Sequence, residues 1–212
     1  MPDLNIIFEK TNNDYSLKLA KFEKNSDFLF QQIKNFLKDN EIANFLKIKN
    51  EKRKIEWLGT RILLKKMLGF YTEIQYNNNG SPYLKIDRHI SITHSKNYIG
   101  IILSKNKNTG IDIEIISDRI LKTASKFIPD TEIKTIKTHK EIYLHWCSKE
   151  TLFKIKGGGG YDFKKDFVLA PFQAEEKGTI TAFITKYGKE QFILSYLFMS
   201  PGNRELLLVW HG

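Results

Sequence analysis

The stretch HISITHSKNYIGIILSKNKNTGIDIEII, residues 89–116, decides the fold. Its apolar residues alternate or run together in three short segments, as they do in β-strands. A polar turn from Lys105 to Gly110 separates the second segment from the third. We predict strands at residues 89–95, 97–104 and 110–116, and we place the seam between two parts of the chain near residues 104–111.

Helical patterns come before strand patterns on both sides of this seam. Before it, apolar residues recur at helical spacing in residues 28–40 and 49–68, and Gly69 ends the second of these helices. After it, Asp118 caps a predicted helix over residues 119–128, and a longer helix is predicted over residues 140–156. The other apolar segments predict strands at 4–8, 74–76, 82–86, 166–173, 178–185, 191–199 and 205–210.

Helices followed by strands, twice over, predict an α+β protein of two similar lobes, residues 1–104 and 105–212. The 212 residues are 41% hydrophobic and 13% aromatic, which is enough to bury a core. No apolar run is long enough to span a bilayer, and the N-terminal residues lack the pattern of a secretory signal. Cys147 is the single cysteine, so no intrachain disulfide can form and we expect a cytoplasmic protein.

The formal net charge of the chain is +10 at pH 7. A charge of this size attracts anions, such as nucleic acid, an acidic protein, a phosphorylated cofactor or an anionic membrane surface. The lysines are scattered along the sequence and form no compact basic block. Charge alone therefore identifies no partner.

Two acids stand on one face of the predicted strand GIDIE. Residues two apart on a strand share a face, so Asp112 and Glu114 project together while the isoleucines point the other way. Such a pattern is ordinarily a half-exposed strand with a polar outer face. The functional interpretation is a site for a hard cation, because Mg²⁺ takes one or two carboxylates together with waters and phosphates.

The predicted helix 140–156 carries an acid and a base one turn apart. Glu150 and Lys154 lie on one helix face, either as a surface ion pair or as a third acid near a metal with a cation for phosphate charge. Lys149 points about 100° away from Glu150, so we expect it to have a separate role or none. The glycines at 157–160 either end the helix or form a mobile loop beside the site.

Four further residues are candidates for binding phosphate. Thr93 and His94 stand near a strand end, where a hydroxyl and an imidazole suit phosphate oxygens, although a lone histidine there is more often structural. Arg53 and Arg61 are eight residues apart, about two helical turns, so both can face one side. Their ordinary interpretation is solvated helix charge.

Five short motifs occur in one order between Arg53 and Lys154. They are two arginines eight apart on a helix, a G-S-P turn, S-I-T-H-S, G-I-D-I-E and W-C-S-K-E-T-L-F-K. In order and separation they resemble the motifs of the 4'-phosphopantetheinyl transferase superfamily, specifically of its Sfp-type, pseudo-dimeric branch. The resemblance covers nearly half of the chain, and its last two motifs together are the most specific part.

The resemblance implies an activity and an architecture. Enzymes of this superfamily transfer phosphopantetheine from coenzyme A to a serine of an apo carrier protein and release adenosine 3',5'-bisphosphate. The branch implies a monomer of two lobes in a pseudo-twofold arrangement, with the active site in the cleft between them. Mg²⁺ as cofactor, coenzyme A as co-substrate and an acidic carrier protein as partner follow from the same resemblance.

Matched to the motifs, the acids and lysines of this chain take particular roles. Asp112 and Glu114 resemble the metal ligands of the family. Glu150 resembles the third acid, which acts as ligand, as base for the incoming serine, or as both. Lys154 resembles the residue that stabilises the pyrophosphate and the leaving group, with Lys149 as a weaker candidate for binding coenzyme A.

The nucleotide side of the site is matched less completely. Thr93 and His94 resemble the pair that holds the 3'-phosphate of coenzyme A, with help from Arg53 or Arg61. In the G-S-P turn, Ser81 stands where the family usually has a lysine, which puts one nucleotide contact in doubt.

Two other interpretations remain. A family member that binds carrier proteins without catalysis is disfavoured, because the three acids and Lys154 are all present. A basic nucleic-acid-binding protein would explain the net charge but not three acids at set positions, and the chain lacks an aromatic–basic motif of the usual kinds. We therefore expect neither nucleic acid nor a membrane as partner.

Overall fold

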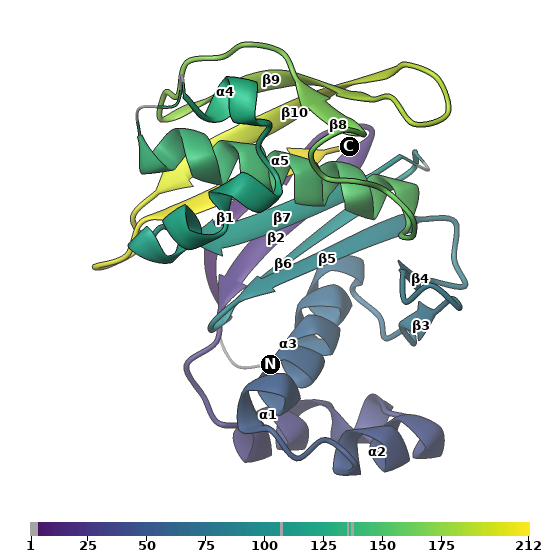
Figure 1. Cartoon of the computed structure of the whole chain (residues 1–212). Coiled ribbons are helices and arrows are strands. Elements are labelled where there is room, and N and C mark those ends of the chain that lie inside the picture. The colour runs from purple at the N-terminus through teal and green to yellow at the C-terminus, as the bar shows by residue number, and fades with distance from the viewer. Residues whose placement is uncertain (1–3, 107, 135, 137) are drawn as a thin grey trace. The chain divides into compact units, whose positions relative to one another are not determined.

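The computed structural model describes residues 4–106, 108–134, 136 and 138–212. Both helices and antiparallel sheets are present, which confirms the predicted α+β class (Figure 1). The chain divides into two compact units with separate hydrophobic cores. Unit 1 is Met1–Asn77 with Pro82–Lys107, and unit 2 is Asn78–Ser81 with Asn108–Gly212.

Unit 1 contains a four-stranded antiparallel sheet with the strand order β1-β2-β6-β5. The sequence patterns predicted three of these strands but missed β2, which pairs with both β1 and β6. In β2, Tyr15, Leu17 and Leu19 are buried and alternate with the less buried Ser16 and Lys18, so the period of two was present in the sequence. The strands are β1 (Asn5–Thr11), β2 (Tyr15–Lys21), β5 (His89–Ser95) and β6 (Tyr98–Ser104).

The helices of unit 1 are α1 (Ser26–Ile33), the 3-10 turn η1 (Lys34–Phe36), α2 (Asp39–Leu46) and α3 (Glu51–Leu68). The prediction of one continuous helix over residues 28–40 is wrong, because Leu37 and Lys38 have extended backbones that separate η1 from α2. The predicted helix up to Leu68 is confirmed as α3, which Gly69 ends with a φ of 80°. In Figure 1, α3 lies against the sheet, where it packs on β2 and β6.

A short hairpin follows α3 in the chain. Its strands are β3 (Gln75–Tyr76) and β4 (Pro82–Tyr83), and Tyr76 pairs with Pro82. By their contacts the turn residues Asn78–Ser81 belong to unit 2, whereas both strands of the hairpin belong to unit 1. The hairpin is where the sequence predicted it.

Unit 2 contains a five-stranded antiparallel sheet with the strand order β7-β11-β10-β9-β8. β7 therefore lies at one edge of this sheet and is paired with β11 alone among its strands. All five strands lie within segments with predicted strand patterns or within one residue of them. They are β7 (Gly110–Ile115), β8 (Phe167–Leu169), β9 (Lys177–Ile184), β10 (Glu190–Met199) and β11 (Leu206–His211).

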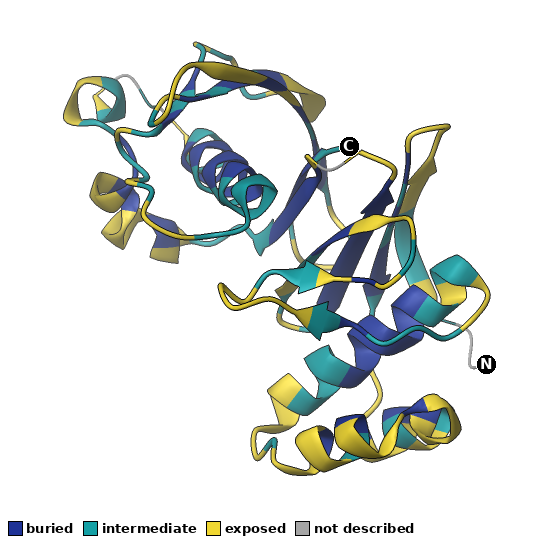
Figure 2. Ribbon diagram, turned by 90° about the vertical axis from the view of Figure 1, so that its right-hand side faces the viewer, coloured by how far each residue is buried: buried dark blue, intermediate teal, exposed yellow. Residues whose placement is uncertain are grey.

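The long helix of unit 2, α5 (His139–Lys156), packs on β7 and β11 (Figure 1). Thr138 and Glu141 form a capping box at its N-terminus, and Gly157 ends it in the left-handed conformation. Figure 2 shows buried residues on much of this helix, so its core-facing surface is wide. The prediction of a helix over residues 140–156 is confirmed.

The segment between β7 and α5 differs from its prediction. Instead of a helix over residues 119–128 it forms two 3-10 turns, η2 (Asp118–Lys122) and η3 (Ala124–Lys126), followed by the single-turn helix α4 (Asp130–Ile133). The helix is interrupted because Thr123 and Phe127, with φ of −121° and −130°, have left helical geometry. None of the described helices is long and apolar enough to cross a membrane.

Gly110 lets β7 approach α5 closely. A Cβ atom at this position would lie 2.6 Å from the backbone carbonyl oxygen of Thr151 and 2.9 Å from the Ile155 side chain. Real Cβ atoms do not come so near to a backbone oxygen. Because strand and helix meet here without a side chain between them, the acids on β7 are held next to α5.

Candidate active site

The acids of β7 face the helix α5. The indole nitrogen of Trp146 donates to Glu114 Oε1 at 3.4 Å, and the Lys154 ammonium donates to Asp112 Oδ1 at 2.7 Å. Asp112 is 6% exposed. The isoleucines on either side of it, Ile111 and Ile113, are buried as well. The predicted alternation is therefore correct, but this polar face is covered by a helix and is not an open surface.

Lys154 binds β7 at two points. Besides Asp112, its Nζ donates to the backbone carbonyl oxygen of Ile111 at 2.8 Å. The Lys154 side chain is one-quarter exposed, whereas that of Asp112 is almost fully buried. A charge-assisted pair of this kind fixes the side chain of Lys154 at the edge of the sheet.

Glu150 lies one helical turn before Lys154 and close to both acids of β7. The pKa of Glu150 is raised to about 7, first by burial and then by the negative charges of Asp112 and Glu114, while Lys154 opposes the shift. Burial, followed by the charges of Asp112 and Glu114, also raises the pKa of the Cys147 thiol well above its ordinary value. The structure thus brings together the three predicted acids and Lys154.

The donor chemistry of these acids suits a hard divalent cation, since carboxylate oxygens are the ligands that Mg²⁺ prefers. After burial, repulsion from Asp112 and Glu114 also raises the pKa of Glu150, and a bound cation would relieve this repulsion. Within the described residues, however, no group of three or more His, Cys, Asp or Glu side chains is arranged to hold a metal ion. In this arrangement the Lys154 ammonium provides a positive charge next to Asp112.

Lys149 is placed elsewhere. Its side chain is 1% exposed, and its ammonium donates to the backbone carbonyls of Phe127 at 2.8 Å and Phe163 at 2.7 Å. Burial lowers the pKa of Lys149 to about 8. The structure does not bring this residue to the acids of β7, which agrees with the separate role expected from its helix face and disfavours a contact with coenzyme A.

In unit 1, Thr93 and His94 lie on opposite faces of β5. Thr93 is buried, whereas the His94 side chain is half exposed. His94 Nδ1 lies 3.3 Å from Glu56 Oε1 on α3. The His94 side chain is therefore half accessible to solvent and lies close to an acid of α3. The buried hydroxyl of Thr93 does not share that face.

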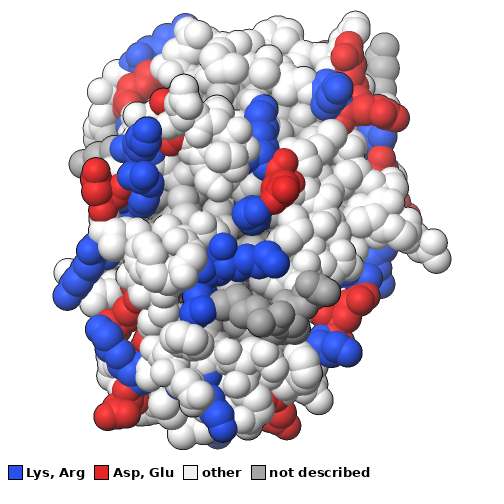
Figure 3. All heavy atoms as spheres, turned by 180° about the vertical axis from the view of Figure 1, so that it is seen from behind, with Lys and Arg blue, Asp and Glu red and all other residues white. Residues whose placement is uncertain are grey.

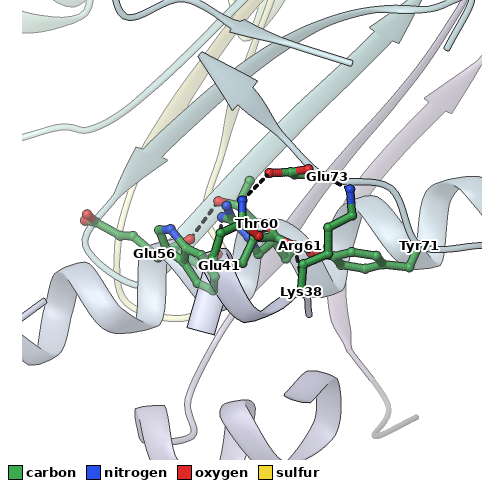
Figure 4. Close-up of polar contacts among 9 residues, drawn as sticks. Lys38, Glu41, Glu56, Thr60, Arg61, Tyr71 and Glu73 are labelled. Carbon is green, nitrogen blue, oxygen red and sulfur yellow. Dashed lines mark hydrogen bonds and ion pairs between the residues drawn. The ribbon is translucent and has the colours of Figure 1, made fainter. Parts of the chain in front are cut away.

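The two arginines of α3 have different surroundings. Arg53 is exposed near the helix N-terminus. Arg61 is 4% exposed, and its Nε donates to Glu41 Oε1 at 3.0 Å (Figure 4). Its guanidinium also lies 3.3 Å from the centre of the Trp57 ring. Arg61 is therefore engaged in the interior of unit 1, and Arg53 is the more accessible of the two arginines predicted to help hold a nucleotide.

Glu41 is the centre of this buried group in Figure 4. Besides Arg61, it accepts a hydrogen bond of 2.5 Å from the Tyr71 hydroxyl, and burial together with this contact raises the pKa of Tyr71. Nothing in the helical spacing of Arg61 distinguishes it from a surface residue. The acid that pairs with Arg61 in the interior, Glu41, lies 20 residues away in the chain.

Two residues without a predicted role contact the candidates. Trp146 belongs to the W-C-S-K-E-T-L-F-K motif, and its indole donates to Glu114. Glu56 lies on α3, and its carboxylate is close to His94. The signal for Glu56 was its place within the R-x7-R segment of α3, between the two arginines.

Positive charge is not confined to one block. On the face shown in Figure 3, lysine and arginine side chains are spread over the surface with acidic side chains between them. This agrees with the scattered lysines of the sequence. On this face the charged side chains of both signs are therefore distributed rather than gathered in one motif.

Comparison with known proteins shows which family this part of the chain is similar to. Residues 108–202 match the family model of the 4'-phosphopantetheinyl transferase superfamily. The matched segment contains β7 and α5 with all three acids and Lys154. The match is to the same superfamily that the sequence motifs resemble.

Particular relatives carry the same name. The chain is 25% identical over 161 residues to the 4'-phosphopantetheinyl transferase gsp of Aneurinibacillus migulanus, covering 64% of this chain and 67% of the relative. It is 24% identical over 119 residues to the 4'-phosphopantetheinyl transferase AcpT of Salmonella typhi, covering 51% of this chain and 62% of that relative. AcpT of Salmonella typhimurium matches to the same extent. The chain thus spans about two thirds or somewhat less of the relatives it matches, all of which are named as transferases.

Proposed function

We propose that this protein transfers the 4'-phosphopantetheine group of coenzyme A to a serine of an apo carrier protein and releases adenosine 3',5'-bisphosphate. The observation that carries the proposal is the grouping of Asp112, Glu114, Glu150 and Lys154 on β7 and α5. It lies within the segment that matches the superfamily. The names of the relatives support the same reaction.

Glu150 suits a proton acceptor for the serine hydroxyl. A carboxyl group with a pKa of about 7 is partly ionised at neutral pH, so it can take the proton as the serine oxygen bonds to phosphorus. The bond from that phosphorus to the leaving phosphate of the nucleotide then breaks. Lys154 supplies a fixed positive charge for the oxygens on which negative charge builds.

We propose that Asp112, Glu114 and Glu150 hold Mg²⁺. When bound, the ion would neutralise the pyrophosphate charge of coenzyme A. The Lys154 ammonium bonds only one oxygen of Asp112, and beside this acid it would also be placed to bind a phosphate oxygen. The dependence of turnover on Mg²⁺ concentration in Glu150→Gln tests whether Glu150 is a base, a ligand or both.

For the 3'-phosphate of coenzyme A, His94 is the best-supported residue. Its side chain is half exposed and lies 3.3 Å from Glu56. Arg53 is exposed on the same helix as Glu56 and is retained as its helper, whereas Arg61 and Lys149 are engaged in the interior. We propose that Thr93 and its neighbouring backbone amides make a smaller contribution to binding the 3'-phosphate.

The remaining features follow from the resemblance. We propose an acidic carrier protein as partner, which the net charge of +10 favours. The Sfp-type pseudo-twofold arrangement of two lobes, divided at residues 104 and 105, with the active site in the cleft between them, and the monomeric state belong to the same proposal. A cytoplasmic setting agrees with the single, free and buried Cys147.

The test is the mass of an apo carrier protein after incubation with coenzyme A and Mg²⁺. The proposal expects a gain of one phosphopantetheine group with the wild-type chain and a much slower gain with Glu150→Gln. Binding of the carrier without a mass change would support a non-catalytic relative instead. Binding of nucleic acid without either result would support the basic nucleic-acid-binding protein.

A further inference from the structure

The turn Asn78–Ser81 has no role in the site described so far. Ser81 occupies the position at which the superfamily motif usually carries a lysine, so the turn has lost one charged group. By its contacts the turn belongs to unit 2. Within that unit it lies against the end of α5 and the glycines that follow.

Two side-chain donors of the turn converge on one backbone acceptor. Ser81 Oγ donates to the carbonyl oxygen of Gly157 at 2.7 Å, and Asn79 Nδ2 donates to the same oxygen. Asn79 Oδ1 in turn accepts from the Ser81 backbone amide at 3.3 Å, which orders the turn itself. Carbonyls at a helix C-terminus have no partner within the helix, so these donors satisfy a group that would otherwise require water.

The glycines make this contact possible. A Cβ atom at Gly157 would lie 3.2 Å from Ser81 Oγ, and one at Gly158 would lie 3.4 Å from the Asn79 Cβ atom. Both glycines also have positive φ, 70° and 114°. Larger residues would therefore be strained in backbone and crowded by the turn. Two of the four glycines are explained by the turn that packs on them.

The contact of the turn with Gly157 is linked to Lys154 by one backbone hydrogen bond. The Gly157 amide donates to the Lys154 carbonyl oxygen at 3.1 Å, and the Lys154 ammonium reaches Asp112 at 2.7 Å. Any group that fixes Gly157 therefore restricts the last turn of α5, from which the ammonium extends. Without such a restraint, the last turn of a helix frays.

We propose that Asn79 and Ser81 are positioning residues, which hold the last turn of α5 through Gly157 and so keep the Lys154 ammonium in place beside Asp112. The kinetic consequence of this inference rests on the proposed function. In this chain, a hydroxyl at position 81 replaces the motif lysine and binds the helix end.

The experiment compares the double variant Asn79→Ala/Ser81→Ala with Asn78→Ala, an exposed neighbour in the same turn. We expect the double variant to lower kcat about ten- to hundredfold, since small displacements of catalytic groups have effects of this size, with little change in the KM for coenzyme A. Asn78→Ala and Ser81→Thr, which keeps the hydroxyl, should stay near wild type. An unchanged kcat in the double variant would overturn the inference.

A second background separates positioning from general destabilisation. If the turn acts through Lys154, the same double substitution should cause no further loss of kcat in a Lys154→Ala chain. A loss as large as in the wild-type background would mean that the turn acts by another route, and would overturn the proposal.

Hydrogen exchange supplies a measurement that does not depend on transfer. Amides of residues 155–160 should exchange faster in the double variant than in Asn78→Ala. Unchanged exchange would overturn the inference even in an active enzyme. Faster exchange in a chain that transfers nothing would support the holding contact and count against the proposed function alone.

Discussion

Lys149 and Lys154 show how much a residue's role depends on its surroundings. They have the same side chain and lie five positions apart on α5. Lys149 is bonded to two buried carbonyls, whereas Lys154 is bonded to an acid of the candidate site. We expect their substitutions to affect different properties of the protein.

Lys154→Ala should lower turnover about a hundred- to thousandfold, because one preorganised charge in an active site has an effect of that size. Affinity for Mg²⁺ should stay the same or improve, since a neighbouring cation is removed. Initial rates measured against Mg²⁺ concentration test both points. Near-normal turnover in a folded Lys154→Ala protein would contradict the assigned role.

Lys149→Met should act mainly on stability. It leaves the carbonyls of Phe127 and Phe163 without their donor, which costs about 1–3 kcal/mol of the free energy of unfolding. Denaturant unfolding measures this loss, and the rate of the folded fraction should fall much less than in Lys154→Ala. If Lys149→Met were the slower enzyme at equal folding, the assignment of the two lysines would be reversed.

His94→Ala should weaken coenzyme A far more than 3'-dephospho-coenzyme A. A lost charge-assisted hydrogen bond to the 3'-phosphate should be worth about 1.5–3 kcal/mol of binding free energy. The measurement is the dissociation constant of both ligands, with His89→Ala as the matched control, since His89 is exposed on the same strand. Equal weakening of the two ligands would return His94 to a structural role.

At the scale of the element, the packing of β7 on α5 depends on one missing side chain. Gly110→Ala places a methyl group 2.6 Å from the Thr151 carbonyl oxygen, so strand and helix must separate. We expect a loss of about 1–3 kcal/mol in the free energy of unfolding, as in other overpacked contacts. Turnover should fall as well, because β7 carries two of the acids. An unchanged melting temperature would show that the contact relaxes easily.

The buried face of α5 also contains a histidine whose charging opposes folding. Burial, and secondarily Lys149, lowers the pKa of His145 to about 4 from an ordinary 6.5. Above pH 6.5 both the folded and the unfolded chain carry the neutral ring. As the pH falls from 6.5 towards 4, the unfolded chain binds the proton first, so stability is lost in that window.

The loss from His145 should reach up to about 3 kcal/mol by pH 4, given about 1.4 kcal/mol for each pKa unit. Denaturant unfolding of the wild type and of His145→Gln across pH 4–7 isolates it, because other groups titrate in both proteins. As the pH falls, the free energy of unfolding of the wild type should fall relative to that of His145→Gln. Parallel curves would mean that His145 is not buried in the neutral form.

The elements show what local sequence could and could not predict. α3 and α5 were predicted nearly to their ends, because each has a capping residue at its N-terminus and a glycine at its C-terminus. The break at Leu37 and the 3-10 turns after Asp118 were missed, since their apolar spacing is also compatible with a helix. In these segments backbone geometry follows tertiary packing rather than local preference.

The site was predictable to the extent that its residues lie in local motifs. The grouping of Asp112 and Glu114 follows from strand periodicity, and that of Glu150 and Lys154 from helical periodicity. The burial of Arg61 was not predictable, because its partner Glu41 comes from another helix. Periodicity shows which residues share a face, but it does not show what covers that face.

For the whole molecule, the net charge of +10 should affect how a carrier protein associates with it. An acidic carrier protein approaches such a surface faster than an uncharged one, and salt weakens this attraction because the Debye length falls to about 10 Å at 0.1 M and about 3 Å at 1 M. Contacts of coenzyme A within the site are short and partly buried, so they are screened less.

Raising the salt concentration through this range should therefore increase the apparent KM for the carrier protein more than the KM for coenzyme A. The second constant serves as an internal control for effects of salt on the enzyme itself. Most of the change should appear in kcat/KM for the carrier, because rim charges act mainly on the rate of association. A KM for the carrier that does not respond to salt would leave the positive charge of this surface without a part in partner binding.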